Sequence, residues 1–220
     1  MTSVFDSEAP AEEPAVAHVA SYGPEAFLLD ATNPNDVPNL LAALDDQSAD
    51  HPALREAHAG ERSILVRIDP TAADAQHTPD MLRQLRPKPL TRTTDHHALP
   101  VSYDGADLAS VAATTALPVQ DVIALHTSAT YRVAFCGFAP GFAYLTGLPE
   151  QLQLPRLDSP RPVVPQGSVA IAAHYCAVYP SQSPGGWLLL GTCQTQLFDP
   201  TATSPALLTA GTTVTFEAIQ

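Results

Sequence analysis

Lysine is nearly absent from this 220-residue chain. Lys88 is the only one, and ten basic residues stand against 23 acidic ones, giving a formal net charge of −13 at pH 7. Nucleic acids and anionic membranes are bound first through basic surfaces that neutralise phosphates, so neither is predicted as a partner. Lys88 lies between two prolines with no glycine-rich loop before it, which excludes a Walker-type phosphate loop.

Metal-binding motifs are missing as well. The three cysteines, Cys136, Cys176 and Cys193, form no CxxC pair, and no HExxH or acid-rich calcium loop occurs, so no metal is predicted. No apolar run approaches the ~18 residues that span a bilayer. The acidic first residues do not resemble a secretory signal, and we therefore expect reduced thiols and a cytoplasmic protein.

The first 93 residues are expected to contain a disordered acidic tail, residues 1–15, and a small α+β domain, residues 16–93. Strand and helix signals alternate in the second of these segments. The predicted strands are 18–22, 26–31 and 63–69, and the predicted helices are 37–46 and 78–86. This alternation predicts a ferredoxin-like sandwich. We place the domain boundary near residue 93, where prolines gather in the segment 86–100 and the apolar periodicity lapses.

Residues 94–220 are expected to form a second domain made mainly of strands. Two helices in series, 107–117 and 118–127, open it as a helical hairpin. After residue 131 the apolar residues alternate in short segments separated by turns, which predicts an antiparallel barrel or sandwich. The expected strands are 131–136, 168–172, 177–179, 187–191 and 212–219.

The segment 135–187 combines glycine and proline with many aromatic residues. Flexible linkers seldom carry so many large apolar groups, so we predict ordered functional loops. Arg156 and Arg161 lie in one such loop, and the planar guanidinium of arginine suits a carboxylate or phosphate. The pair therefore indicates an anion site, unless it only ties the loop down through Asp158 and Asp199.

Two glycine-containing loops and the histidines are further candidates. The loops GFAPGFAYL and SPGGW either bring backbone amides close to a bound oxyanion or simply form tight turns. His126 and His174 are candidate acid–base groups because histidine titrates near neutrality, and a structural role is the alternative. Cys136 and Cys176 are interpreted as small buried apolar groups rather than nucleophiles.

Five segments resemble the family formed by the B subunit of bacterial 5-oxoprolinase, whose members are also described as allophanate hydrolase subunit 1 and as KipI-like proteins. They are VSYDGADL (101–108), DVIALHTSATYRVAFCGFAPGFAYLTGL (121–148), PRLDSPRPVVPQGSVAIA (155–172), YPSQSPGGW (179–187) and LFDP (197–200). The resemblance implies a small α+β domain followed by a cyclophilin-like β-barrel. It also implies two partners, a cyclophilin-like C subunit and an A subunit. Their complex uses ATP to open the small amide 5-oxo-L-proline to L-glutamate.

The resemblance further implies that this chain supplies part of a shared site and is inactive alone, with no ATP site assigned to it. We take Arg161, Arg156 and His126 as the candidate catalytic residues. Arg161 binding an anionic group is the leading hypothesis, in which Arg161→Ala abolishes turnover and leaves the complex intact. The substrate-binding candidates fall on three loops: Gly137, Phe138, Pro140, Gly141 and Phe142; Pro165, Gly167 and Ser168; and Tyr179, Ser183, Pro184, Gly185, Gly186 and Trp187.

The chain departs from the family pattern in one segment. Residues 173–178 read AHYCAV where the family usually has a glycine-rich stretch, which predicts a narrowed or re-lined pocket. Two alternative functions remain open. One is a regulatory protein that inhibits a histidine kinase, and the other is a carboxyltransferase-type component that acts on urea or another small amide.

Overall fold

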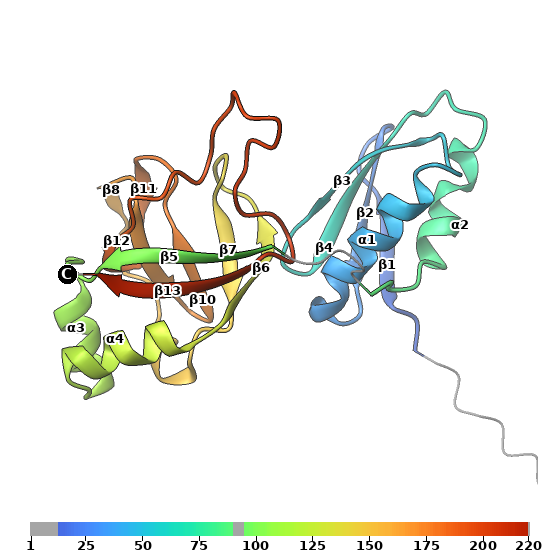
Figure 1. Ribbon diagram of the computed structural model, residues 1–220. Coiled ribbons are helices and arrows are strands. Elements are labelled where there is room, and N and C mark those ends of the chain that lie inside the picture. The colour runs from blue at the N-terminus through green and yellow to red at the C-terminus, as the bar shows by residue number, and fades with distance from the viewer. Residues whose placement is uncertain (1–12, 90–94, 220) are drawn as a thin grey trace, which may run out of the picture. The chain divides into compact units, whose positions relative to one another are not determined.

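The computed structural model describes residues 13–89 and 95–219. Backbone contacts divide the chain into two units, residues 1–89 and 90–220, which we describe separately (Figure 1). The predicted boundary near residue 93 lies outside the described residues, and so does most of the predicted tail, residues 1–15.

The first unit is a four-stranded antiparallel sheet with two α-helices packed on one face. Its elements are β1 (Val16–Ser21), β2 (Ala26–Ala31), the 3-10 helix η1 (Pro34–Asp36), α1 (Val37–Gln47), β3 (Leu54–Ala59), β4 (Ser63–Ile68), η2 (Ala75–His77) and α2 (Thr78–Arg83). Leu29 of β2 pairs with Ile64 of β4, and both side chains are buried against Leu40 of α1. The predicted strands and helices of this unit are confirmed in place.

The sequence did not reveal β3 because three of its six residues, LREAHA, are polar and the others are one leucine and two alanines. The sheet order β1-β2-β4-β3 places β3 at an edge, where half-exposed polar side chains are tolerated. The predicted ferredoxin-like arrangement is not confirmed. Its element order is β-α-β-β-α-β, whereas the order here is β-β-α-β-β-α.

The second unit contains a closed β-barrel of seven strands in the order β10-β7-β6-β13-β5-β12-β9. Its strands are β5 (His96–Ser102), β6 (Tyr131–Cys136), β7 (Ala143–Thr146), β9 (Ser168–Ala172), β10 (Tyr175–Val178), β12 (Leu188–Thr192) and β13 (Thr213–Ile219). A separate two-stranded ribbon pairs β8 (Arg161–Val164) with β11 (Ser183–Gly185), and η3 spans Glu150–Leu152. The barrel prediction is confirmed, and its cyclophilin-like character stays a prediction.

Two helices, α3 (Leu108–Thr115) and α4 (Val119–Ser128), pack against the barrel core through Leu108, Val111 and Val122. Ala116 ends α3 in the left-handed conformation (φ 54°), and the chain bends by 94° before α4. The pair is therefore a corner rather than the predicted hairpin. No single helix in residues 13–89 and 95–219 is long and apolar enough to cross a membrane, although this bent pair passes that test when both helices are taken together.

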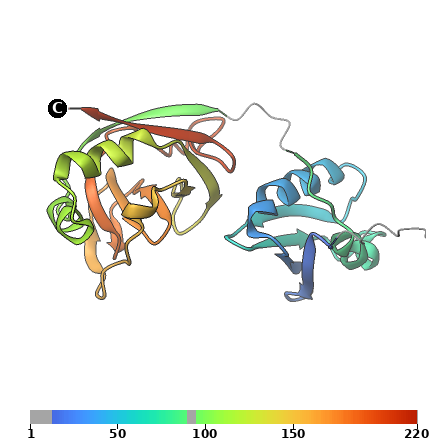
Figure 2. The ribbon, with the colours of Figure 1, turned by 90° about the horizontal axis from the view of Figure 1, so that it is seen from below.

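Strands β5 and β13 lie side by side and run parallel (Figure 2), whereas the other described strand pairs of the barrel are antiparallel. The prediction of a fully antiparallel barrel is therefore wrong at this pair. The sequence also assigned much of β5 to the segment between domains. Its two histidines and Pro100 interrupt the apolar pattern by which a strand is recognised, although Leu99 and Val101 are buried.

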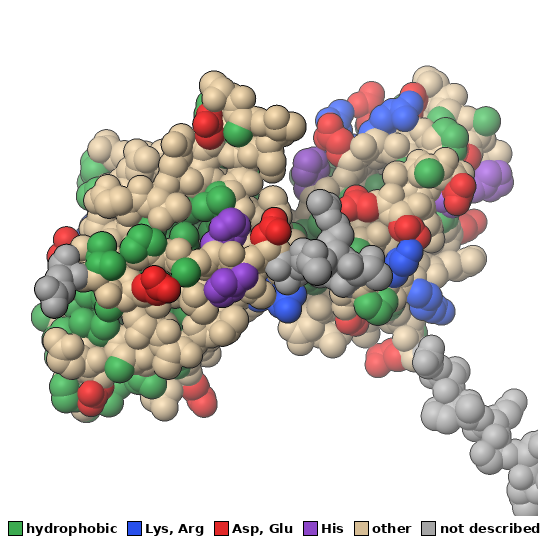
Figure 3. Space-filling view, viewed as in Figure 1, with side chains coloured by type: hydrophobic (Ala, Val, Ile, Leu, Met, Phe, Trp, Pro, Cys, Tyr) green, Lys and Arg blue, Asp and Glu red, His purple; other side chains and the backbone are tan. Residues whose placement is uncertain are grey.

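On the face shown in Figure 3 the basic side chains gather on the first unit. The barrel unit shows few, since residues 96–220 contain three arginines and no lysine. The arginines of this unit are Arg132, Arg156 and Arg161.

Candidate functional site

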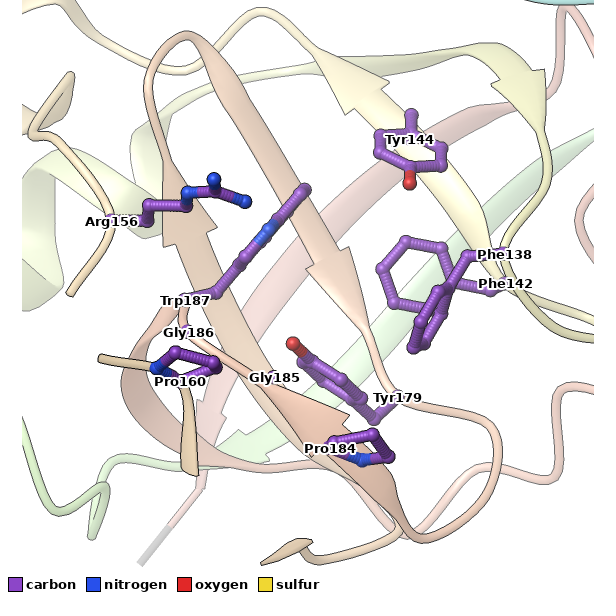
Figure 4. A pocket seen from close by; sticks show the side chains of 10 residues that line it. All are labelled: Phe138, Phe142, Tyr144, Arg156, Pro160, Tyr179, Pro184, Gly185, Gly186 and Trp187. Carbon is purple, nitrogen blue, oxygen red and sulfur yellow. The ribbon is translucent and has the colours of Figure 1, made fainter. Parts of the chain in front are cut away.

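Three loops of the barrel unit meet around a pocket of about 250 Å³. In Figure 4, Phe138, Phe142 and Tyr144 stand on one side of it, and Arg156, Trp187 and Pro160 stand on the other. The residues that line the pocket are Phe138, Phe142, Tyr144, Arg156, Pro160, Tyr179, Pro184, Gly185, Gly186 and Trp187. Eight of these ten are among the predicted site residues; the exceptions are Tyr144 and Pro160.

The aromatic side of the pocket is built by the turn between β6 and β7. Phe138 and Gly141 both have positive φ, 68° and 80°, which tightens the turn and leaves Phe138 60% exposed at the pocket rim. Phe142 is buried, and its ring makes edge contacts with Tyr144, Tyr179 and Trp187 at centroid distances of 5.0, 5.3 and 5.8 Å. This cluster gives the pocket a rigid apolar floor.

The opposite side is held by the ribbon of β8 and β11. Gly185 pairs with Arg161 across the ribbon, and a Cβ on Gly185 would overlap the Tyr179 hydroxyl. The Leu157 amide donates to the Gly186 carbonyl at 2.7 Å, which ties the loop that carries Arg156 to the same wall. Glycine at position 185 is therefore required for Tyr179 to reach the pocket.

The described side chains that line the pocket offer hydrogen-bond donors and no carboxylate. Arg156 is exposed and has no ion-pair partner within the described residues. Burial raises the pKa of the Tyr144 and Tyr179 hydroxyls, which therefore stay protonated at neutral pH. Together with the indole N–H of Trp187, these groups suit a small ligand that carries acceptor oxygens and a negative charge.

Arg161 does not line the pocket. Its Nη2 donates to Oδ1 of Asp107 at 2.5 Å, and its Nη1 donates to the Trp187 carbonyl at 3.3 Å. The partner is thus Asp107 rather than Asp158 or Asp199. Its guanidinium is thus engaged within the chain, which argues against the leading hypothesis of an anion bound at Arg161. Of the two arginines, Arg156 lines the pocket and has no ion-pair partner among the described residues.

His126 is not at the pocket either. It is fully buried in the barrel core, with Nδ1 2.7 Å from the Tyr103 hydroxyl and Nε2 3.3 Å from Sγ of Cys176. Burial lowers the pKa of His126 to about 3 and raises that of the Cys176 thiol, so the first is neutral and the second protonated. We correct the acid–base assignment of His126, whose role is structural.

The buried imidazole makes stability depend on pH. The folded pKa of about 3 lies below the ordinary 6.5, so between these values the unfolded chain binds a proton that the folded chain does not. We expect this residue to remove about 1.4 kcal/mol of stability for each pH unit below 6.5. Urea unfolding of the wild type and of His126→Leu from pH 7.5 to 4.5 measures this; parallel pH profiles of the two proteins would contradict it.

The remaining predicted site residues on the three loops do not line the pocket: Gly137, Pro140, Gly141, Pro165, Gly167, Ser168 and Ser183. Gly141 and Gly167 adopt positive φ, and a Cβ on Gly141 would lie 2.6 Å from Cβ of Phe198. Both glycines therefore determine the shape of their loops. The Ser183 hydroxyl is buried with no hydrogen-bond partner among the described residues.

Tyr144 was missed although a signal was present. Side chains two apart in extended backbone share a face, and Phe142 directly precedes β7, so an extended reading of this segment would have placed Tyr144 beside Phe142. The unusual segment 173–178 does not line the pocket. Its Tyr175 packs edge-on against Tyr144 at 5.5 Å, behind the pocket wall, and its Cys176 lies in the core.

Several known proteins are similar to this chain in sequence, in fold or in both. The family model described as carboxyltransferase domain, subdomain C and D, matches residues 17–208. The B subunit of 5-oxoprolinase from Escherichia coli O157:H7 is 50% identical over 121 residues, which are 54% of this chain and 56% of that protein. This chain thus spans about half the length of the curated relatives it matches.

Two solved structures agree in fold. The crystal structure of TTHA0988 has a TM-score of 0.77 at 34% identity, covering 89% of this chain and 40% of that one. The urea amidolyase of K. lactis has a TM-score of 0.68 at 17% identity, covering 100% of this chain and 16% of that one, and it supports the fold alone. With the family model matched across both units, the chain belongs to the carboxyltransferase domain family, subdomains C and D.

Proposed function

We propose that this chain is the B subunit of a 5-oxoprolinase, a cytoplasmic complex that also contains a cyclophilin-like C subunit and an A subunit. In it, 5-oxo-L-proline is opened to L-glutamate, and ATP hydrolysis drives the reaction. Support comes from the half-length match to relatives of that name and from a pocket whose polar side chains are all donors. The three free cysteines fit a reducing compartment.

The pocket chemistry matches both functional groups of this substrate. The lactam ring would lie against Phe142 and Trp187, and its carboxylate would meet the Arg156 guanidinium at the rim. Ring opening adds one water across the amide C–N bond, forming a carboxylate and an ammonium group. Negative charge develops on the lactam oxygen during that addition, and the Tyr179 hydroxyl would stabilise it.

The proposed function, in which this chain supplies only part of a shared active site, rests mainly on the composition of the pocket wall. None of the described residues that line it is a carboxylate or a histidine, so this wall offers no general base for activating water. The exposed ring of Phe138 at the rim adds an apolar contact surface. We therefore assign the proton-transfer group to a partner protein of the complex that closes the pocket.

The test is ATP-dependent release of glutamate from 5-oxoproline by the purified chain, alone and with the A and C subunits. Activity is expected only when all three proteins are present. Omitting this chain is the control for activity of the other two. Full activity of those two without it, or a complex that forms but releases no glutamate, would contradict the proposal.

A further inference from the structure

We infer that Asp107 and Arg161 form a clamp that positions the side of the pocket carrying Trp187 and Gly185, which we call the Trp187 wall. Both are therefore positioning residues. The inference rests on the proposed function only for its kinetic test. The clamp joins three elements that are far apart in sequence: the turn before α3, the first residue of β8, and the start of β12.

Both oxygens of the Asp107 carboxylate are engaged. Oδ1 accepts from Nη2 of Arg161, and Oδ2 accepts from the Leu189 amide at 2.7 Å. The Asp107 side chain is 10% exposed and that of Arg161 is 28% exposed. An ion pair so poorly solvated keeps more of its strength than a surface pair, because water and salt screen it less.

Arg161 connects Asp107 to the residues of the Trp187 wall. Its second nitrogen donates to the carbonyl of Trp187, two residues before the amide held by Asp107. Arg161 also pairs with Gly185 in the ribbon, so one residue fixes both segments of the wall. Its charge partly offsets the rise in the Tyr179 pKa caused by burial, as expected of a cation close to that ring.

Losing the clamp should shift the wall without unfolding the barrel. Val164, at the other end of β8, is fully buried in the aromatic cluster with Phe142 and Tyr179 and retains the ribbon. Near Arg161 the Asp107 carboxylate and the Trp187 carbonyl would each lose a donor and draw in water. The indole of Trp187 would then move within the pocket.

The chain offers a direct probe, since Trp187 is its only tryptophan. In Arg161→Met we expect a red-shifted tryptophan emission maximum and stronger acrylamide quenching, with an unchanged far-UV circular dichroism spectrum. Arg161→Lys keeps the charge without the planar fork and is expected to be intermediate. Arg132→Met is the matched control, because exposed Arg132 donates to the Gly211 carbonyl away from the pocket and its loss should leave the emission unchanged.

In the assembled enzyme, Arg161→Met should raise KM for 5-oxoproline roughly tenfold and change kcat little, because a displaced wall weakens binding. Wild-type emission and KM in folded Arg161→Met would overturn the inference. If that variant does not fold, Asp107→Asn decides by the same readouts, because it keeps an acceptor for Leu189 and removes the ion pair. The fluorescence arm needs no turnover, so failure of the clamp is distinguishable from failure of the proposed function.

Discussion

Replacing Arg156 by methionine is expected to lower kcat/KM for 5-oxoproline by roughly 100-fold or more in the assembled complex. Arg156 is the one cation among the described residues that line the pocket, and no acidic residue there competes for it. A charge-assisted hydrogen bond to a carboxylate contributes ~3 kcal/mol or more in a partly enclosed site, which corresponds to that factor. Steady-state glutamate release at varied 5-oxoproline concentrations measures it.

Folding should be unaffected, because Arg156 is exposed and makes no ion pair among the described residues. Arg132→Met removes another exposed arginine of the same unit and should retain near wild-type kinetics. Arg156→Lys should recover part of the loss through its point charge. Wild-type kcat/KM in Arg156→Met would exclude this residue as the carboxylate anchor.

Gly185→Ala is expected to reduce kcat/KM by about 100-fold through a steric effect. The new methyl group would overlap the Tyr179 hydroxyl and lie 3.0 Å from the ring carbon that bears it. Tyr179 is 2% exposed and packed edge-on against Phe142, so its ring has little room to withdraw. Displacing a binding group by about 1 Å is sufficient for a loss of this size.

The neighbouring glycine provides a comparison for this variant. A Cβ on Gly186 would meet its nearest atoms at 3.5 Å, an ordinary contact, so Gly186→Ala should cost far less. In a Tyr179→Phe background the hydroxyl is gone, and Gly185→Ala should lose much of its effect. Additive losses in this double-mutant cycle would show that the two residues do not clash, contrary to the geometry.

The sequence was most informative where a periodic apolar pattern ran unbroken. Strand β6 and strand β9 occur where the apolar pattern indicated them; buried and exposed residues alternate at the start of β6, whereas all five residues of β9 are buried. Strands β3, β5, β7, β8 and β11 were not predicted. They are short, polar or interrupted by proline, and their strand form depends on neighbours that are distant in sequence.

Candidate site residues were predicted by type more reliably than by role. Most lining residues of the pocket come from the aromatic and glycine-rich loops that the sequence indicated, and their part in function stays a prediction. The ion pair of Arg161 was not predicted, since only the fold shows that Asp107 reaches Arg161 across 54 residues. His126 lies on α4, where sequence alone does not show that its face is completely buried.

The parallel pairing of β5 with β13 affects when the barrel can fold during synthesis of the chain. His96 and Thr213 lie side by side in that pair although 117 residues separate them. The barrel cannot close on the ribosome until β13 has emerged, while the first unit, whose strands pair locally, is free to fold much earlier. Such distant pairing raises the contact order, so barrel closure should be the slow step of folding. Until then the unpaired edges of β5 and β6 are exposed, so we expect this nascent intermediate to be prone to aggregation.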